Sequence, residues 1–340
     1  MEHTPLITND AVVLGILMVI LAFVFRTSHS DNPRWKKFYG VVPSLLLCYF
    51  IPSLFSTFGI ISGEQSNLYF VASRYLLPTS LVLLTISIDL PGVMRLGPKA
   101  VTMFFTGTAG IVIGGPAAIW LVALVSPETV GMGTDDVWRG LTTVAGSWIG
   151  GGANQTAMKE VFEVSDEVFG QLVAVDVIVA NIWMACLLWA AGRSKEIDAK
   201  TGADASAIEH VREKVQAYRA SISKIPTLTD TMTVLAVGFA VTAIAHACAD
   251  FLAPFLMENA PQLQRFSLTS HFFWLIVIAT TMGLILSSRS EVRRLEGVGA
   301  SRLGSAFLYV LVATIGMKMN LMAIFEHPAL FLIGGIWMLI

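Results

Sequence analysis

The feature that most constrains this chain is a series of apolar runs, each long enough to cross the hydrocarbon core of a membrane. Only 14 % of the 340 residues are charged, whereas about 25 % are charged in a typical soluble domain. An ordinary soluble globular protein is therefore excluded, and we predict an all-α polytopic membrane protein. We place spans near residues 11–25, 39–58, 68–89, 100–125, 168–192, 230–257, 267–287 and 298–317, with a further run from Pro328 to Ile340.

Residues 139–163 form an ambiguous segment, because an apolar beginning is broken by glycines at 150–152 and followed by polar residues. The segment can cross the membrane once as a broken helix, or it can enter and return as a re-entrant hairpin. A returning segment puts 17 of the 22 Lys and Arg residues on the inner side, whereas a crossing segment puts 9 there. The positive-inside rule therefore favours the hairpin, and it places the N-terminus outside. The basic residues left outside are then Arg74, Arg139, Lys159, Arg265 and Lys318.

The two halves of the chain show weak self-similarity, since residues 85–90 resemble residues 314–319. In the favoured topology the two copies have opposite orientations, which predicts an inverted-repeat, transporter-like fold. We divide the chain into a first membrane repeat at 1–192, with five spans and the broken element, a cytoplasmic linker at 193–229, and a second membrane repeat at 230–340. The capping box and apolar spacing of the linker predict an amphipathic helix at 206–223.

The glycine break is the first candidate for a binding site. A triple glycine at membrane depth leaves backbone groups without helical partners, which is tolerated only inside protein or beside a wet cavity. Such backbone groups and the adjoining helix ends can bind an ion or an anionic substrate. The alternative is a packing turn between helices. The candidate binding residues in this segment are Ser147, Trp148, Gly150, Gly151, Gly152, Asn154, Gln155 and Thr156.

Asp176 is the second candidate, because it lies near the middle of its span, with Asn181 further along. An ionisable residue at that depth is costly and marks an ion or substrate pathway. An acid satisfied by a neighbouring helix is the alternative. Other polar residues give weaker signals: His246 and Asp250 can pair on one helix face, and snorkelling to the interface explains Lys318.

No catalytic or metal-binding signature accompanies these candidates. The sequence contains no nucleophile elbow, HExxH motif or P-loop, and the three cysteines lack metal-ligand spacing. We therefore expect no enzyme activity, no catalytic residues, no protein-held metal centre and no cofactor other than Na⁺ or H⁺ as a coupling ion. The net charge of −2 gives no indication of nucleic-acid binding.

The residues GSWIGGGANQTAMKEVF at 146–162, followed by Asp176 in VAVDVIVANIWMA, resemble the YjcL-like family of uncharacterised membrane proteins. This family is similar to the cation:proton antiporter and anion transporter superfamily. The resemblance implies panel spans, a homodimer formed through them, and a core in which two broken elements cross near mid-membrane. By that analogy the first broken element is residues 150–156, and Asp176 lies on the span beside it.

The resemblance also implies a second broken element, which the repeat offset places at about residue 376. Because the chain ends at Ile340, we expect either a fragment or a relative that another chain completes. The expected function is secondary transport of an ion or small organic anion, coupled to Na⁺ or H⁺. The alternative is a receptor or scaffold subunit of the same fold that does not transport. We expect an integral protein of a bacterial inner (plasma) membrane, with the lipid bilayer and a small ion or anionic metabolite as its partners.

Overall fold

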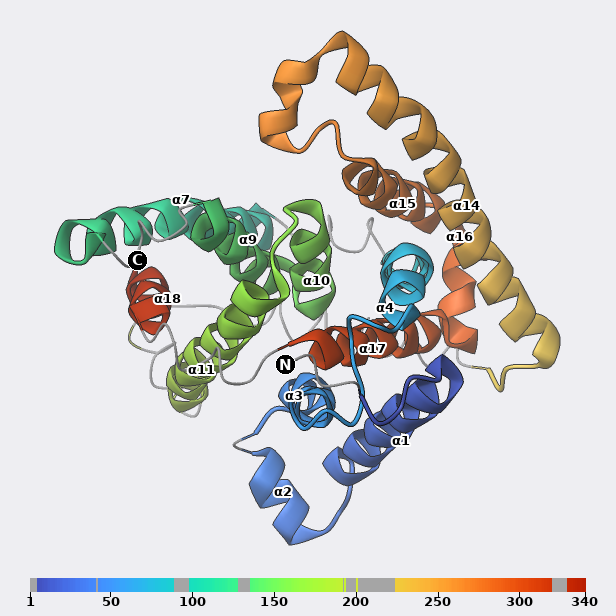
Figure 1. Cartoon of the computed structure of the whole chain (residues 1–340), viewed down its shortest axis with the longest axis horizontal. Coiled ribbons are helices and arrows are strands. Elements are labelled where there is room, and N and C mark those ends of the chain that lie inside the picture. The colour runs from blue at the N-terminus through green and yellow to red at the C-terminus, as the bar shows by residue number, and fades with distance from the viewer. Residues whose placement is uncertain are drawn as a thin grey trace.

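A computed structural model describes residues 5–40, 42–88, 98–127, 135–191, 193, 200, 224–319 and 329–340. Within these ranges the regular structure is entirely helical, as the apolar runs predict (Figure 1). Six helices are long and apolar enough to cross a membrane, and the number rises to eight if each of two bent helix pairs is one span. The predicted polytopic, all-α fold is therefore confirmed. The amphipathic helix predicted at 206–223 lies outside the described residues.

The helices coincide with the predicted spans. The span at 68–85 is interrupted by a π-helix, Ala72–Leu76, between α4 and α5. The bent pairs are α2 with α3, and α15 with the short helices at 290–298. The elements are α1 (Asp10–Ser28), α2 (Pro33–Tyr39), α3 (Ser44–Thr57), α4 (Leu68–Val71), α5 (Leu77–Thr85), α7 (Pro98–Val125), α9 (Asp135–Gly150), α10 (Gly152–Val161), α11 (Asp166–Ala191), α14 (Leu228–Asn259), α15 (His271–Ser287), α16 (Ser290–Arg293), α17 (Ala300–Lys318) and α18 (Ala329–Leu339).

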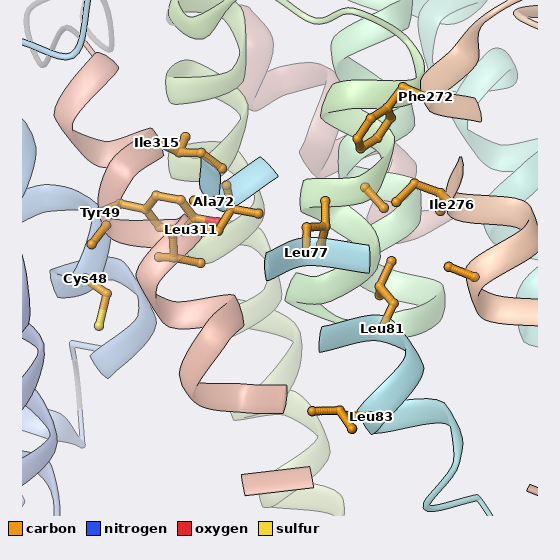
Figure 2. Packing of buried hydrophobic residues seen from close by; sticks show 14 of the residues in the cluster. Cys48, Tyr49, Ala72, Leu77, Leu81, Leu83, Phe272, Ile276, Leu311 and Ile315 are labelled. Atoms are coloured by element: carbon orange, nitrogen blue, oxygen red, sulfur yellow. The ribbon is translucent and has the colours of Figure 1, made fainter. Parts of the chain in front are cut away.

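Buried apolar residues form two clusters. The larger one joins α1, α3, α5, α10, α11, α14, α15 and α17, and Figure 2 shows Tyr49 of α3 beside Leu311 and Ile315 of α17. The smaller cluster joins α7, α9, α11 and α18. The hairpin formed by α9 and α10 contributes to both, because α9 belongs to the smaller cluster and α10 packs on the larger one. A site on this hairpin therefore lies between two packed groups of helices.

The span at 68–85 and α17 run antiparallel to each other. Gly63, just before that span, lies so close to Lys318 at the C-terminus of α17 that an added Cβ would contact it. At the other end, Ser80 Oγ donates to the carbonyl of Gly304, near the N-terminus of α17, at 2.7 Å. Opposite directions for these two helices agree with the sequence similarity between their C-terminal ends. The inverted repeat as a whole stays a prediction.

The segment at 139–163 is a hairpin. Arg139, near the start of α9, donates from Nη1 to the carbonyl of Phe162, just after α10, at 3.0 Å. The rings of Trp138 and Phe162 also meet, with centroids 6.0 Å apart. Both ends of the segment therefore lie together, which selects the returning arrangement over a single crossing. This is the arrangement that the charge distribution favours.

Candidate functional site

The tip of the hairpin depends on its glycines. Gly151 separates α9 from α10 and has φ +83° and ψ −175°, a conformation that is open essentially to glycine alone. At Gly150, a Cβ would overlap the side-chain amide of Asn154. No side chain caps the N-terminus of α10, so its first backbone N–H groups are left for water or a ligand. The turn therefore requires glycine at both positions, at Gly151 for its backbone conformation and at Gly150 for lack of space.

Asp176 on α11 lies against this turn and accepts three hydrogen bonds. Trp148 Nε1 donates to Oδ1 at 2.7 Å, Ser147 Oγ donates to Oδ2 at 2.8 Å, and Gln155 Nε2 donates to Oδ2 at 3.0 Å. Asp176 is only 6 % exposed. Ser147 and Trp148 end α9, whereas Gln155 lies in the first turn of α10. Both arms of the hairpin therefore hold the same carboxyl group.

The charge of this carboxyl group has no basic partner nearby. In the part of the chain that the structure describes, no Lys, Arg or His nitrogen lies within ion-pair distance of Asp176. Its three donors, an indole, a hydroxyl and an amide, are all neutral. A buried carboxylate without a counter-charge costs several kcal/mol, by an order-of-magnitude estimate. The site is therefore suited to a cation that neutralises the carboxylate.

Depth along α11 places this site well below the open end of the hairpin. Asp166 is the first residue of α11, and Asp176 follows ten residues later. At the rise of an α-helix, this separation is about 15 Å, or half of a hydrocarbon core about 30 Å thick.

The Trp148 side chain links the site to α18 and α7. Its ring contacts the Trp337 ring of α18, and the two ring centroids are 4.9 Å apart. Trp337 in turn donates to the carbonyl of Ile111 on α7 at 2.9 Å.

The structure does not bring every predicted residue to the carboxyl group. Thr156 is buried, but its hydroxyl donates at 2.9 Å to the carbonyl of Gly152 in its own helix. The Asn154 amide fills the space beside Gly150 instead. Asn181 lies on α11 beyond Asp176, and its side chain is outside the described part of the structure. The geometric centre of the predicted site is thus Asp176 with Ser147, Trp148 and Gln155.

A second polar cluster lies at the open end of the hairpin, and sequence reasoning missed it. Lys159 Nζ lies 2.9 Å from Asp166 Oδ1, and Lys318 Nζ lies 2.7 Å from Asp166 Oδ2. Arg74 Nη1 lies 2.9 Å from Glu160 Oε2. Lys318, at the end of α17, is therefore paired with an acid, a contact that its position at a span end does not predict. The one available signal was the positive-inside count, which put Arg74, Lys159 and Lys318 on one side.

The expected pairing of His246 with Asp250 is also wrong. Asp250 Oδ1 lies 2.9 Å from His271 Nε2 on α15, and His246 Nε2 lies 2.9 Å from the carbonyl of Arg74. Neighbouring helices thus supply nearer partners than the next turn of the same helix. Among the described residues, no group of three or more His, Cys, Asp and Glu side chains is arranged to hold a metal ion.

Comparisons with known proteins give a family but no characterised relative. Neither the curated proteins nor the solved structures contain a match to this chain. A family model matches residues 15–340, nearly the whole chain, which confirms an uncharacterised family. The YjcL-like name and the link to the antiporter superfamily stay predictions. The chain belongs to the family described as "Protein of unknown function (DUF819)".

Proposed function

We propose that this protein is a secondary transporter that moves an ion or small organic anion, coupled to Na⁺ or H⁺. Several apolar helices are long enough to cross a membrane, which indicates an integral membrane protein. The proposal places the coupling site at Asp176 and the turn of the α9–α10 hairpin. Alternating access then consists of a relative movement of the two packed groups of helices between which the site lies.

The observation that carries the proposal is the state of Asp176. It is buried, accepts three hydrogen bonds from neutral donors, and has no basic partner among the described residues. A purely structural acid at this depth is normally paired with a basic group, because pairing offsets the cost of burying its charge. A bound Na⁺ or proton supplies that neutralisation, and its release to either side couples the cation to the conformational change.

The hairpin turn offers a complementary place for an anion. The uncapped N-terminus of α10 presents backbone N–H groups and the positive end of the helix dipole. Gln155, in the first turn of α10, is bonded to Asp176 at 3.0 Å. Cation binding at the carboxyl group and anion binding at the helix end therefore act on the same few residues. This proximity gives a physical route for coupling two solutes.

Transport is tested in liposomes that contain the purified protein. We impose a Na⁺ gradient and record radiolabelled Na⁺ uptake. We then impose a pH gradient and record the pH of the liposome lumen with an enclosed dye. Each gradient is applied with and without small mono- and dicarboxylates such as lactate and succinate. We expect gradient-driven flux above that of protein-free liposomes. Cation or carboxylate binding without any flux would overturn the transport proposal and favour a receptor or scaffold.

A variant at the turn tests the assignment of the site. Asn154→Ala removes an amide beside the uncapped helix end while leaving the three hydrogen bonds to Asp176 in place. We expect slower flux from the folded variant, because the amide is one of the polar groups at the turn. Flux equal to that of the unmodified protein, together with unchanged stability, would remove Asn154 from the transport site.

A further inference from the structure

The open end of the hairpin contains a cavity that is separate from the Asp176 site. Its volume is about 560 Å³, which is within the usual range for small-molecule sites. Its walls come from the end of α10, the start of α11, the start of α15, the end of α17 and the π-helix Ala72–Leu76. π-Helical turns inside spans are rare and are frequent at functional sites. Arg74, on this π-helix, points its guanidinium group over the Phe272 ring at 4.5 Å from the centroid.

The cavity wall contains a buried carboxylate oxygen that lacks a hydrogen-bond donor. The Glu160 side chain is only 6 % exposed. Its Oε2 accepts from Arg74, but its Oε1 has no hydrogen-bond partner. Lys159 Nζ lies 3.7 Å from Oε1, which is too far for a hydrogen bond. Buried polar atoms are normally satisfied, so this oxygen calls for an N–H donor. It is closed to solvent, so a ligand supplies that donor once the Glu160 side chain turns toward the cavity.

Counted as formal charges, the Arg, Lys, Asp and Glu side chains that line the cavity balance each other; His271 also lies in the wall, and burial raises the pKa of Glu160 to about 7. Three basic residues, Arg74, Lys159 and Lys318, face three acidic residues, Glu160, Glu163 and Asp166. A solute with a net charge would upset this balance in a partly buried space. A zwitterion keeps the balance and can still use both signs of charge. The lining therefore favours a small solute that carries one ammonium and one carboxylate group.

The spacing of two wall groups fits one class of zwitterion. Arg74 and Glu160 are in direct contact, with Nη1 2.9 Å from Oε2. In an α-amino acid the ammonium and carboxylate groups are likewise adjacent, because a single carbon separates them. The Arg74 side chain is 32 % exposed, so its guanidinium is accessible, and its planar fork suits a carboxylate. We propose that this cavity binds an α-amino acid, whose ammonium donates to Glu160 Oε1 and whose carboxylate accepts from Arg74.

This site does not depend on the proposed transport activity. Gln155, which holds Asp176, and Lys159, which lines the cavity, are one turn apart on α10. Their separation of four residues corresponds to about 6 Å along the helix axis. Binding in the cavity is measured without a membrane gradient, so its failure and a failure of transport are distinguishable. In the folded Asp176→Asn variant we expect amino-acid binding to persist, and its loss there would overturn the separation of the sites.

The test is thermal unfolding of the detergent-purified protein with defined probes, because a ligand that binds the native state raises its stability. Each natural amino acid is tested, and the best one is compared with its analogues. The first analogue lacks the ammonium group, the second lacks the carboxylate, and the third has a trimethylated nitrogen that donates no hydrogen bond. We expect stabilisation by the amino acid only. No stabilisation by any amino acid, or equal stabilisation by an analogue, would overturn the proposal.

Two variants locate the binding site. Glu160→Gln weakens binding by about ten- to a hundredfold, the ratio typical of a charge-assisted hydrogen bond. Glu167→Gln makes the same chemical change on an exposed residue that does not line the cavity, and binding stays unchanged. Equal binding by both variants would refute the role of Glu160. If Glu160→Gln does not fold, Glu160→Asp keeps the charge, and the analogue series on the unmodified protein still decides the outcome.

Discussion

We expect Asp176→Ala to destabilise the protein far more than Asp176→Asn. The carboxyl group accepts hydrogen bonds from Trp148, Ser147 and Gln155 in a site that is almost closed to solvent. Alanine removes the acceptor for all three donors at once. The Ser147 hydroxyl can rotate to another acceptor, but the Trp148 indole is a donor only, and the Gln155 amide is buried, with 1 % exposure, away from water.

The magnitude follows from the two donors that lose their acceptor. Both substitutions remove the same buried charge, and each buried donor left without a partner costs about 1 to 3 kcal/mol, so Asp176→Ala should be about 2 to 6 kcal/mol less stable than Asp176→Asn. Asparagine retains one carbonyl oxygen for Trp148, and its amide can donate to Ser147 and to a flipped Gln155. It also removes an unpaired buried charge, whose relief offsets the weaker hydrogen bonds. We therefore expect Asp176→Asn to lie within about 1 kcal/mol of the unmodified protein.

The assay is the free energy of unfolding in mixed detergent micelles, obtained by titration with SDS and followed by tryptophan fluorescence. A matched control is Glu167→Gln, which changes an exposed acid at the start of the same helix. Equal stability of the alanine and asparagine variants would refute the reasoning, because it would mean that the donors of the hairpin do not depend on the Asp176 carboxyl group.

Three further predictions concern the glycines and the buried charges. Gly150→Ala should lower the free energy of unfolding by about 1 to 3 kcal/mol, because its methyl group would overlap the Asn154 amide. Asn154→Ala in the same chain should restore most of that stability in a double-mutant cycle. Gly316→Ala should lower the free energy of unfolding, measured by SDS titration, by at least as much. No side-chain truncation should restore it, because the added Cβ would overlap the backbone of α3. Lys159→Met should cost about 3 to 5 kcal/mol, since this 5 % exposed cation is bonded to Asp166; a loss near zero in the same titration would contradict a buried ion pair.

Much of the fold is predictable because the membrane sets the length of each element. A run of apolar residues long enough to span hydrocarbon forms a helix, since every backbone group must find a partner within it. The hairpin at 139–163 was also predictable, because only a returning segment places most of the Lys and Arg residues on the inner side of the membrane. The structure confirms both, with α9 and α10 folded together at Arg139 and Phe162.

The contacts within the site were only partly predictable. Asp176, Ser147, Trp148 and Gln155 were all candidates, since polar groups at membrane depth are costly and need partners. Which atoms meet depends on the packing of α11 against the hairpin, and a single sequence does not specify that packing. The charged cavity was missed for a related reason: Arg74, Lys159 and Lys318 come from three distant segments, and nothing in a single sequence brings them together.

The most direct test of the account is the initial rate of gradient-driven flux through Asp176→Asn, compared with Glu167→Gln. Both variants replace one acid by its amide on α11, but only Asp176 is buried against the hairpin. We expect Asp176→Asn to fold and its Na⁺- or H⁺-driven flux to fall to that of protein-free liposomes, whereas Glu167→Gln transports as the unmodified protein does. Undiminished flux through Asp176→Asn would contradict the claim that this carboxyl group binds the coupling ion.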